Sequence, residues 1–126
     1  MAGEKILIVE DNAVNLKLMR VLLESAGYDL RFAANADEAL RILEVFHPSL
    51  ILMDVQLPGM DGITLIRNLK ADPKTAGIVM LVVTSYAMKG DEEKAIAAGC
   101  DGYLTKPIDT RSLASTVAQY IAGGTR

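Results

Sequence analysis

The sequence predicts an α/β fold in which five parallel strands form one doubly wound sheet with helices on both faces. Short apolar runs alternate five times with longer segments whose apolar residues recur at helical spacing. The first, third and fourth runs are nearly all apolar, as strands are when both faces of a sheet are covered, whereas 29–33 is more polar and is expected near an edge of the sheet. The segments between them are long enough for right-handed crossover helices. We expect strands at 5–9, 29–33, 50–53, 78–84 and 103–105.

The predicted helices have recognisable beginnings and ends. Asn35 and Glu38 resemble a capping box, and Gly27 stands where a glycine often ends a helix. The third helix is expected over 63–71, and Asp109 can cap the last one. The first helix is expected to bury four residues and the second helix three: Val14, Leu18, Val21 and Leu22, then Ala39, Leu40 and Leu43.

Length and composition narrow the possible functions. The 126 residues fit a single domain, so we expect 1–126 to form one unit without a separate DNA-binding or catalytic module. A net charge of −3 provides no basic surface for nucleic acid. No apolar run approaches the roughly 20 residues of a membrane span, and the first residues lack the build of a signal peptide. With one cysteine, Cys100, no internal disulfide can form. We therefore expect a cytoplasmic protein that binds neither membranes nor nucleic acid.

Charged and hydroxyl side chains follow four of the five predicted strands. Glu10 and Asp11 follow the first strand, Asp54 the third, and Lys106 the fifth, while Thr84 ends the fourth. The carboxyl ends of parallel strands meet at one edge of the sheet, so these groups should lie together. Two carboxylates 4 Å apart repel by about 4 kcal/mol at an effective dielectric constant of 20. The cluster therefore requires a cation, and oxygen ligands in a shallow site favour Mg²⁺.

Each of these residues also has an ordinary structural explanation. Taken alone, Asp11 is as well explained as a helix cap, Asp54 as a turn residue and Lys106 as a solvated surface lysine. Taken together, the ordinary explanations require four separate strand ends to carry complementary groups by coincidence. The joint arrangement therefore favours a functional site.

Four segments identify a family by their order and spacing: 9–12 (VEDN), 52–62 (LMDVQLPGMDG), Thr84 and 103–107 (YLTKP). They resemble the receiver domain of two-component response regulators, and the likeness covers essentially the whole chain. The resemblance implies a flavodoxin-like sheet with the strand order 2-1-3-4-5. Three shorter phrases are similar to stand-alone receivers of the DivK type and to receivers of hybrid kinases: 12–16, 56–58 and 87–93.

The resemblance implies a phosphorylation site. Asp54 would be the phosphoacceptor, and Mg²⁺ would be held by Glu10, Asp11, Asp54 and the backbone carbonyl of Gln56. Lys106 would bind a phosphoryl oxygen. The phosphoryl donor would be a phosphohistidine on a histidine kinase or a histidine phosphotransfer protein. Apart from its own phosphorylation and dephosphorylation, the protein would catalyse no reaction.

The resemblance also implies a switch and a docking surface. Thr84 would donate its hydroxyl to the phosphoryl group, and Tyr103 would rotate inward behind it. The signal would pass to a protein target through the fourth helix, the fifth strand and the fifth helix. The Lys106-Pro107 bond would be cis, as in the family. The phosphoryl donor would dock beside the site on four residues: Asn15, Leu16, Met19 and Pro107.

The resemblance also implies that two residues flank the approach of water to the phosphoryl group, and here these are Gln56 and Tyr86. Gln56 could orient a hydrolytic water, whereas Tyr86 could cover the phosphoryl group. One orienting hydrogen bond is worth about 1 kcal/mol, while shielding excludes the nucleophile itself, so we expect a persistent phosphoryl group. We expect the protein to be a monomer or a weak dimer.

Three alternatives remain at this stage. The chain could be a receiver cut from a hybrid histidine kinase, with 123–126 as a linker. An Mg²⁺-dependent aspartyl phosphatase of the haloacid dehalogenase type would need a second aspartate where Gln56 stands. A flavodoxin-like flavin carrier would need a hydroxyl- and glycine-rich loop where 10–13 (EDNA) stands.

Overall fold

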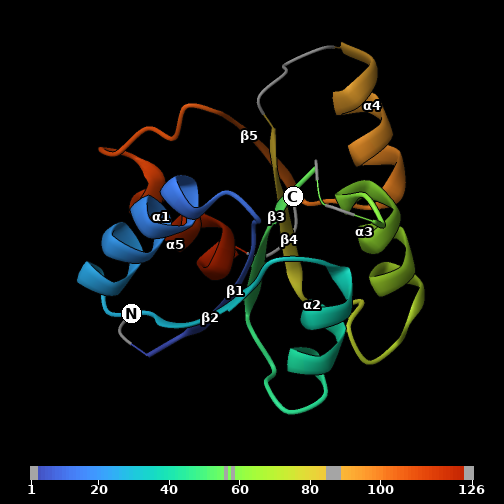
Figure 1. Ribbon diagram of the computed structural model, residues 1–126, viewed down its shortest axis with the longest axis horizontal. Helices are drawn as coiled ribbons and strands as arrows, with labels where there is room; N and C mark the ends of the chain where they lie inside the picture. The colour runs from blue at the N-terminus through green and yellow to red at the C-terminus, as the bar shows by residue number, and fades with distance from the viewer. Residues whose placement is uncertain (1–2, 56, 58, 85–88, 124–126) are drawn as a thin grey trace.

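The computed structural model describes residues 3–55, 57, 59–84 and 89–123, and of residues 89–92 it describes the backbone alone. Five strands alternate with five helices along this part of the chain (Figure 1). The strands are β1 (Lys5–Val9), β2 (Asp29–Ala33), β3 (Leu50–Asp54), β4 (Val79–Thr84) and β5 (Gly102–Thr105). The helices are α1 (Ala13–Ser25), α2 (Ala36–Leu43), α3 (Gly62–Ala71), α4 (Lys89–Ala98) and α5 (Leu113–Gly123). The expected strands begin and end within one residue of these bounds.

The five strands form one parallel sheet in the order β2-β1-β3-β4-β5, as the resemblance implies. Asp54, at the end of β3, pairs with Val83 in β4, and Thr84 pairs with Thr105 in β5. This register brings the carboxyl ends of the central strands and of β5 to one edge of the sheet. Ligand sites of parallel sheets lie at that edge.

Helices cover both faces of the sheet. Helices α1 and α5 lie on one face, and α2, α3 and α4 lie on the other (Figure 1). Successive strand residues point to opposite faces, so β1 sends Ile6 and Ile8 toward α1 and α5, and Leu7 and Val9 toward the other three helices. All four side chains are fully buried, which explains why β1 is almost entirely apolar.

Helix α1 turns a different face to the sheet from the one expected. Met19 and Leu23 are buried in the core, with Met19 only 1% exposed, whereas Val14 is 76% exposed and Val21 is also exposed. The expectation that Val14 and Val21 point inward is therefore wrong. The helix carries apolar residues at helical spacing on two overlapping faces. The face that packs against the sheet carries Met19, whose long, flexible side chain can fill an irregular space in the core.

Helix α2 follows the sequence prediction at its start and departs from it on its inner face. Asn35 accepts a hydrogen bond from the backbone of Glu38, and Glu38 in return accepts one from the backbone of Ala34. Leu40 was expected in the core but is exposed, while Leu43 is buried. Within the described ranges, no helix combines the length and apolar character needed to cross a membrane.

Candidate functional site

Three carboxylates meet at the carboxyl edge of the sheet. Glu10 directly follows β1, Asp11 comes next, and Asp54 is the last residue of β3. One carboxylate oxygen from each of them lies within 4.8 Å of the other two. Glu10 and Asp54 are 1% and 4% exposed, while Asp11 is exposed. The strand ends therefore assemble the acidic pocket (Glu10, Asp11 and Asp54) that the sequence predicts.

One ammonium group faces this acidic pocket. The Nζ of Lys106 lies 3.2 Å from Oδ2 of Asp54, and 3.3 and 3.4 Å from the two carboxylate oxygens of Glu10. The backbone N–H of Lys106 donates to the carbonyl of Thr84, which fixes the chain just after β5. The Lys106-Pro107 peptide bond is cis, as expected. Among the side chains that the structure describes, this one cation stands against three carboxylates, so the pocket keeps an excess of negative charge.

The surroundings of Glu10 raise the pKa of its carboxyl group. The pKa of the Glu10 carboxyl is raised from 4.5 to about 7, chiefly because the group is buried and further because of its hydrogen bond with Asp54 and the negative charge of Asp54. Lys106 and the backbone N–H of Asn12 lower this pKa only in part. Oε1 of Glu10 is buried and forms an ion pair with Lys106 at 3.3 Å, but no described residue donates a hydrogen bond to it. A buried carboxylate oxygen beside two further carboxylates suits a hard divalent cation such as Mg²⁺.

The turn after Asp54 requires glycine. A Cβ on Gly62 would overlap the backbone oxygen of Asp54, so only glycine lets α3 begin this close to the end of β3. The N–H of Gly62 donates to the carbonyl of Val55 at 2.9 Å, and Gly59 has a φ of +80°. Asp61 caps α3 by accepting from the N–H of Thr64. The segment 59–62 thus folds back against the pocket and holds Asp54 in place.

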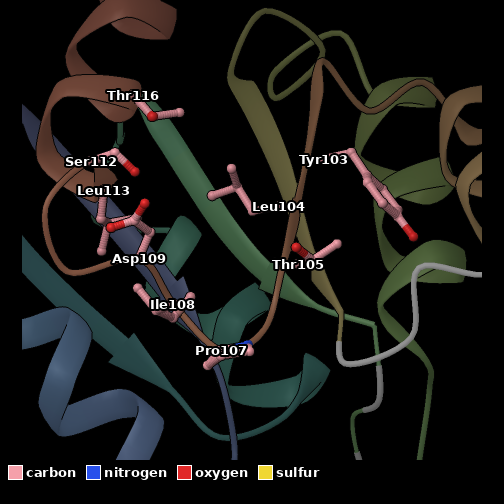
Figure 2. A pocket seen from close by; sticks show the side chains of 9 residues that line it. All are labelled: Tyr103, Leu104, Thr105, Pro107, Ile108, Asp109, Ser112, Leu113 and Thr116. Atoms are coloured by element: carbon pink, nitrogen blue, oxygen red, sulfur yellow. The ribbon is translucent and has the colours of Figure 1, made fainter.

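The two residues expected to form the switch lie on neighbouring strands. Thr84 ends β4 and is buried at the carboxyl edge. Tyr103 is half-buried against the core under α2, α3 and α4, and Figure 2 shows it leaving β5 on the side opposite to Leu104. Gln56 and Tyr86, the residues expected to govern dephosphorylation, lie outside the described residues.

The four expected docking residues differ in how exposed their side chains are. Asn15 and Leu16 are half-buried on α1, and Pro107 is exposed next to Lys106. Met19 belongs to the core, so the expectation that it faces a partner is wrong. Val14, which was expected in the core, lies exposed on the first turn of α1, three residues after Asp11. The spacing of the apolar residues along α1 fits two faces of the helix, so the sequence alone does not show which face is buried.

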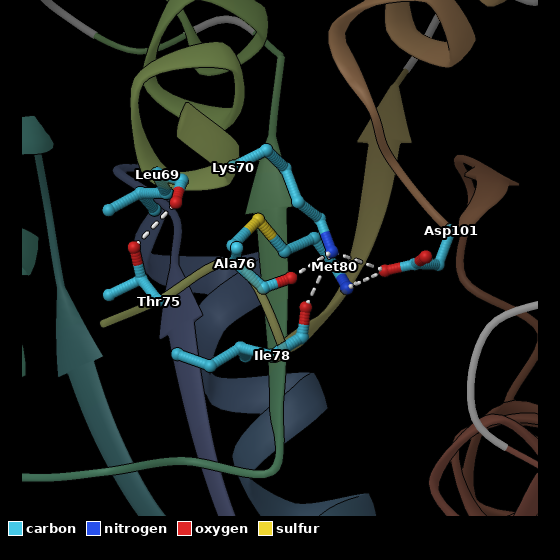
Figure 3. A network of polar contacts seen from close by, with 7 residues as sticks. All are labelled: Leu69, Lys70, Thr75, Ala76, Ile78, Met80 and Asp101. Atoms are coloured by element: carbon cyan, nitrogen blue, oxygen red, sulfur yellow. Dashed lines mark hydrogen bonds and ion pairs between the residues drawn. The ribbon is translucent and has the colours of Figure 1, made fainter. Parts of the chain in front are cut away.

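A second lysine–carboxylate cluster lies at the opposite edge of the sheet (Figure 3). Nζ of Lys70, at the end of α3, donates to the carbonyls of Ala76 and Ile78 and to Oδ2 of Asp101 at 2.9–3.1 Å. The same Oδ2 accepts the backbone N–H of Met80 at 2.8 Å. Asp101 is 3% exposed. The sequence gives no signal for this cluster, because Lys70 lies in the last turn of a helix and Asp101 precedes a strand instead of following one.

Comparison with known proteins places the chain in a family. The sequence model of the response regulator receiver domain matches residues 6–118. The chain belongs to this family, and it is a phosphorylation-controlled signalling switch. It is 41% identical over 118 residues to the polar-differentiation response regulator DivK of Brucella ovis, a match that covers 94% of this chain and 96% of that protein. The phosphatase and flavin-carrier alternatives are not favoured.

Solved structures give the same family. A receiver domain of a signal transduction histidine kinase from Syntrophus aciditrophicus superposes with a TM-score of 0.88 at 35% identity, covering 98% of this chain and 93% of that one. The receiver domain of a sensor histidine kinase from Pseudomonas aeruginosa PAO1 gives 0.87 at 34% identity, covering 96% and 99%. That structure has a magnesium ion coordinated in its active-site cleft.

Proposed function

We propose that this receiver accepts a phosphoryl group on Asp54 from a phosphohistidine of a histidine kinase or a histidine phosphotransfer protein. The observation that carries the proposal is the position of Asp54. Its carboxylate is buried among two other acids, and Lys106 lies 3.2 Å from one of its oxygens. A carboxylate held by an ammonium group in an acidic pocket is arranged for phosphoryl transfer, which depends on positioning and charge stabilisation.

Three carboxylates would hold Mg²⁺ in this pocket: Glu10, Asp11 and Asp54. The predicted fourth ligand, the backbone carbonyl of Gln56, lies outside the described residues. When bound, the ion neutralises charge on the phosphoryl oxygens. Two observations support this assignment: the magnesium in the related Pseudomonas receiver, and the buried Oε1 of Glu10, which accepts no hydrogen bond from the described residues.

Asp54 acts as the nucleophile in the proposed transfer. One carboxylate oxygen forms a bond to phosphorus while the phosphorus–nitrogen bond of the phosphohistidine breaks. The electron pair of that bond stays on the imidazole nitrogen, which takes up a proton. Lys106 exchanges its contact with Asp54 for one with a phosphoryl oxygen and so stabilises the charge that the transfer brings in.

The added charge would drive the switch. A phosphorylated side chain carries roughly 1.5–2 negative charges, and the hydroxyl of Thr84 would turn toward them. Tyr103 would then move inward on the neighbouring strand, changing the surface formed by α4, β5 and α5. A cleft of about 240 Å³ between β5 and α5, lined in part by Tyr103, Pro107 and Ser112, lies on this surface (Figure 2).

The phosphoryl donor would dock beside the acidic pocket. Asn15, Leu16 and Pro107 remain the proposed contacts, and we add Val14 in place of Met19. Val14 follows the acidic residues at the start of α1, and its side chain is largely exposed. An exposed apolar residue next to a reactive pocket is suited to contact with a partner helix.

Other parts of the proposal concern properties of the whole molecule. We propose a cytoplasmic monomer or weak dimer that catalyses only its own phosphorylation and dephosphorylation. We also propose a persistent phosphoryl group shielded by Tyr86. Replacement Tyr86→Ala should then speed loss of the phosphoryl group after the donor is removed. An equal or slower loss would leave Gln56 as the controlling residue.

Intact-protein mass after incubation with acetyl phosphate and Mg²⁺ tests the central proposal. The wild type should gain one phosphoryl group, and Asp54→Asn should gain none. Asp61→Asn is the matched control: its residue caps α3 through an oxygen that asparagine keeps, so this variant should be phosphorylated normally. Full phosphorylation of Asp54→Asn would refute the assignment.

A further inference from the structure

A cleft of about 570 Å³ opens between the C-terminal ends of α2 and α3. It lies at the edge of the sheet opposite the acidic pocket, because both helices end there and Ile78 immediately precedes β4. Its floor consists of three leucines and an isoleucine: Leu40, Leu43, Leu69 and Ile78. Leu40 was expected in the core, and its exposure in this cleft leaves apolar surface in contact with water.

Acidic residues at the ends of two helices line this cleft. Glu44 is the C-cap of α2, and Asp72 is the C-cap of α3. The C-terminal end of a helix carries a partial negative charge, so the dipoles of both helices add to these carboxylates. The carboxylate of Asp72 is held in position because its Oδ1 accepts the backbone N–H of Lys74 at 3.0 Å.

The basic groups near the cleft do not cancel this charge. Lys70, although close in sequence, directs its ammonium group to Ala76, Ile78 and Asp101. The lining residues therefore contribute two carboxylates against the ammonium of Lys74, a net charge of −1 when His47 is neutral.

We propose that this cleft binds a small organic cation with an apolar body, such as an amine attached to an aromatic or aliphatic group. The volume falls within the range of about 300–1,000 Å³ that is typical of small-molecule sites. The apolar floor would receive the body of the ligand, and the carboxylates of Glu44 and Asp72 would face its charge. The site is separate from the phosphorylation chemistry, so it stands or falls independently of the role of Asp54.

Three probes of matched size but different charge test the proposal: 4-phenylbutylamine, 4-phenylbutanol and 4-phenylbutyrate. Each is titrated into the full chain while methyl and amide NMR signals are followed. The amine should give saturable shifts at Leu43, Leu69 and Ile78. Its affinity should exceed that of the alcohol by about two- to fivefold, the size expected of an exposed ion pair, and the carboxylate should bind most weakly.

Charge-removing variants complete the test. The double variant Glu44→Gln, Asp72→Asn keeps the side-chain sizes and the oxygen that accepts from Lys74, and it should abolish the preference for the amine. Glu24→Gln, an exposed acid on α1, is the control and should leave the preference unchanged. Thermal unfolding of each variant establishes that it is folded. The absence of saturable shifts, equal binding of amine and carboxylate, or a preference that survives in the folded double variant would overturn the proposal.

Discussion

A lysine–carboxylate cluster lies at each end of the parallel strands, one at the carboxyl edge of the sheet and one at the opposite edge. The two clusters differ in the ratio of positively to negatively charged groups. At one edge Lys70 meets one carboxylate and two carbonyls, and Asp101 also accepts the N–H of Met80. At the other edge Lys106 contacts two of three clustered carboxylates, and Oε1 of Glu10 pairs with Lys106 but accepts no hydrogen bond from the described residues. The groups of the first cluster satisfy one another, whereas the second keeps an excess of negative charge that the proposed Mg²⁺ would offset.

This difference separates a structural ion pair from a functional one. The Lys70–Asp101 pair links the end of α3, the start of β4 and the segment between α4 and β5. Its groups are satisfied, so it stabilises one arrangement of the chain. The acidic pocket instead holds charges that repel one another, and the proposed metal ion would relieve that repulsion.

The largest expected effects come from removing each lysine. Lys70→Met should lower the free energy of unfolding by about 3 kcal/mol, because Asp101 would remain buried without its cation. It should leave phosphorylation intact. Lys106→Met should slow phosphorylation by acetyl phosphate about 100-fold, as expected when one group that stabilises developing charge is lost. Urea denaturation and time-resolved intact mass measure the two effects. The comparison fails if Lys70→Met slows phosphorylation as much as Lys106→Met.

Mg²⁺ should stabilise the folded protein through the acidic pocket and not through the Lys70–Asp101 cluster, by an amount nearly as large as the effect of removing a lysine. An ion that binds only the folded state adds about 2.7 kcal/mol at a concentration one hundred times its Kd. Asp11→Asn should reduce this gain and raise stability without metal, because it removes one repelling charge. Asp101→Asn should leave the gain unchanged. Melting temperatures with and without Mg²⁺ provide the measurement, and equal responses from both variants would contradict the distinction.

The pH dependence of stability should also be governed by the acidic pocket. The pKa of Glu10 is raised to about 7 in the folded state, so its protonated form favours folding. Without metal, its contribution to stability should be fully present below pH 4.5 and should be lost as pH rises toward 7. Glu10→Gln should flatten this decline, while the control Glu44→Gln should preserve it. Urea denaturation between pH 4 and about 8 checks this prediction, and a decline equally steep in Glu10→Gln would assign it to other groups.

The smallest effect on stability is expected at the rim of the acidic pocket. Val14→Ala should change the free energy of unfolding by less than about 0.5 kcal/mol, because the side chain is largely exposed. Met19→Ala, on the same helix, should cost about 2–4 kcal/mol because it leaves a cavity in the core. If the docking proposal holds, Val14→Ala should slow transfer from a phosphohistidine protein while its rate with acetyl phosphate stays normal. Equal slowing with both donors would remove Val14 from the docking surface.

Much of the fold and the site could be predicted from local patterns. The strands are short apolar runs with clear limits, and parallel strands necessarily bring their carboxyl ends to one edge. Glu10, Asp54 and Lys106 could therefore be assigned to one pocket although they are distant in sequence. The capping residue Asn35 was also predictable, because a cap depends on groups only three residues away.

Tertiary structure alone decided which face of α1 is buried and how Lys70 is used. The apolar residues of α1 fit two overlapping faces, and only packing against the sheet and α5 selects Met19 over Val14. Lys70 stands in the last turn of a helix, where a lysine usually favours the helix dipole. Its partner Asp101 lies 31 residues away, so the pair forms only after α3, β4 and the start of β5 have come together. Local sequence specifies contacts within a few residues, whereas these contacts depend on the packing of elements that local sequence does not place.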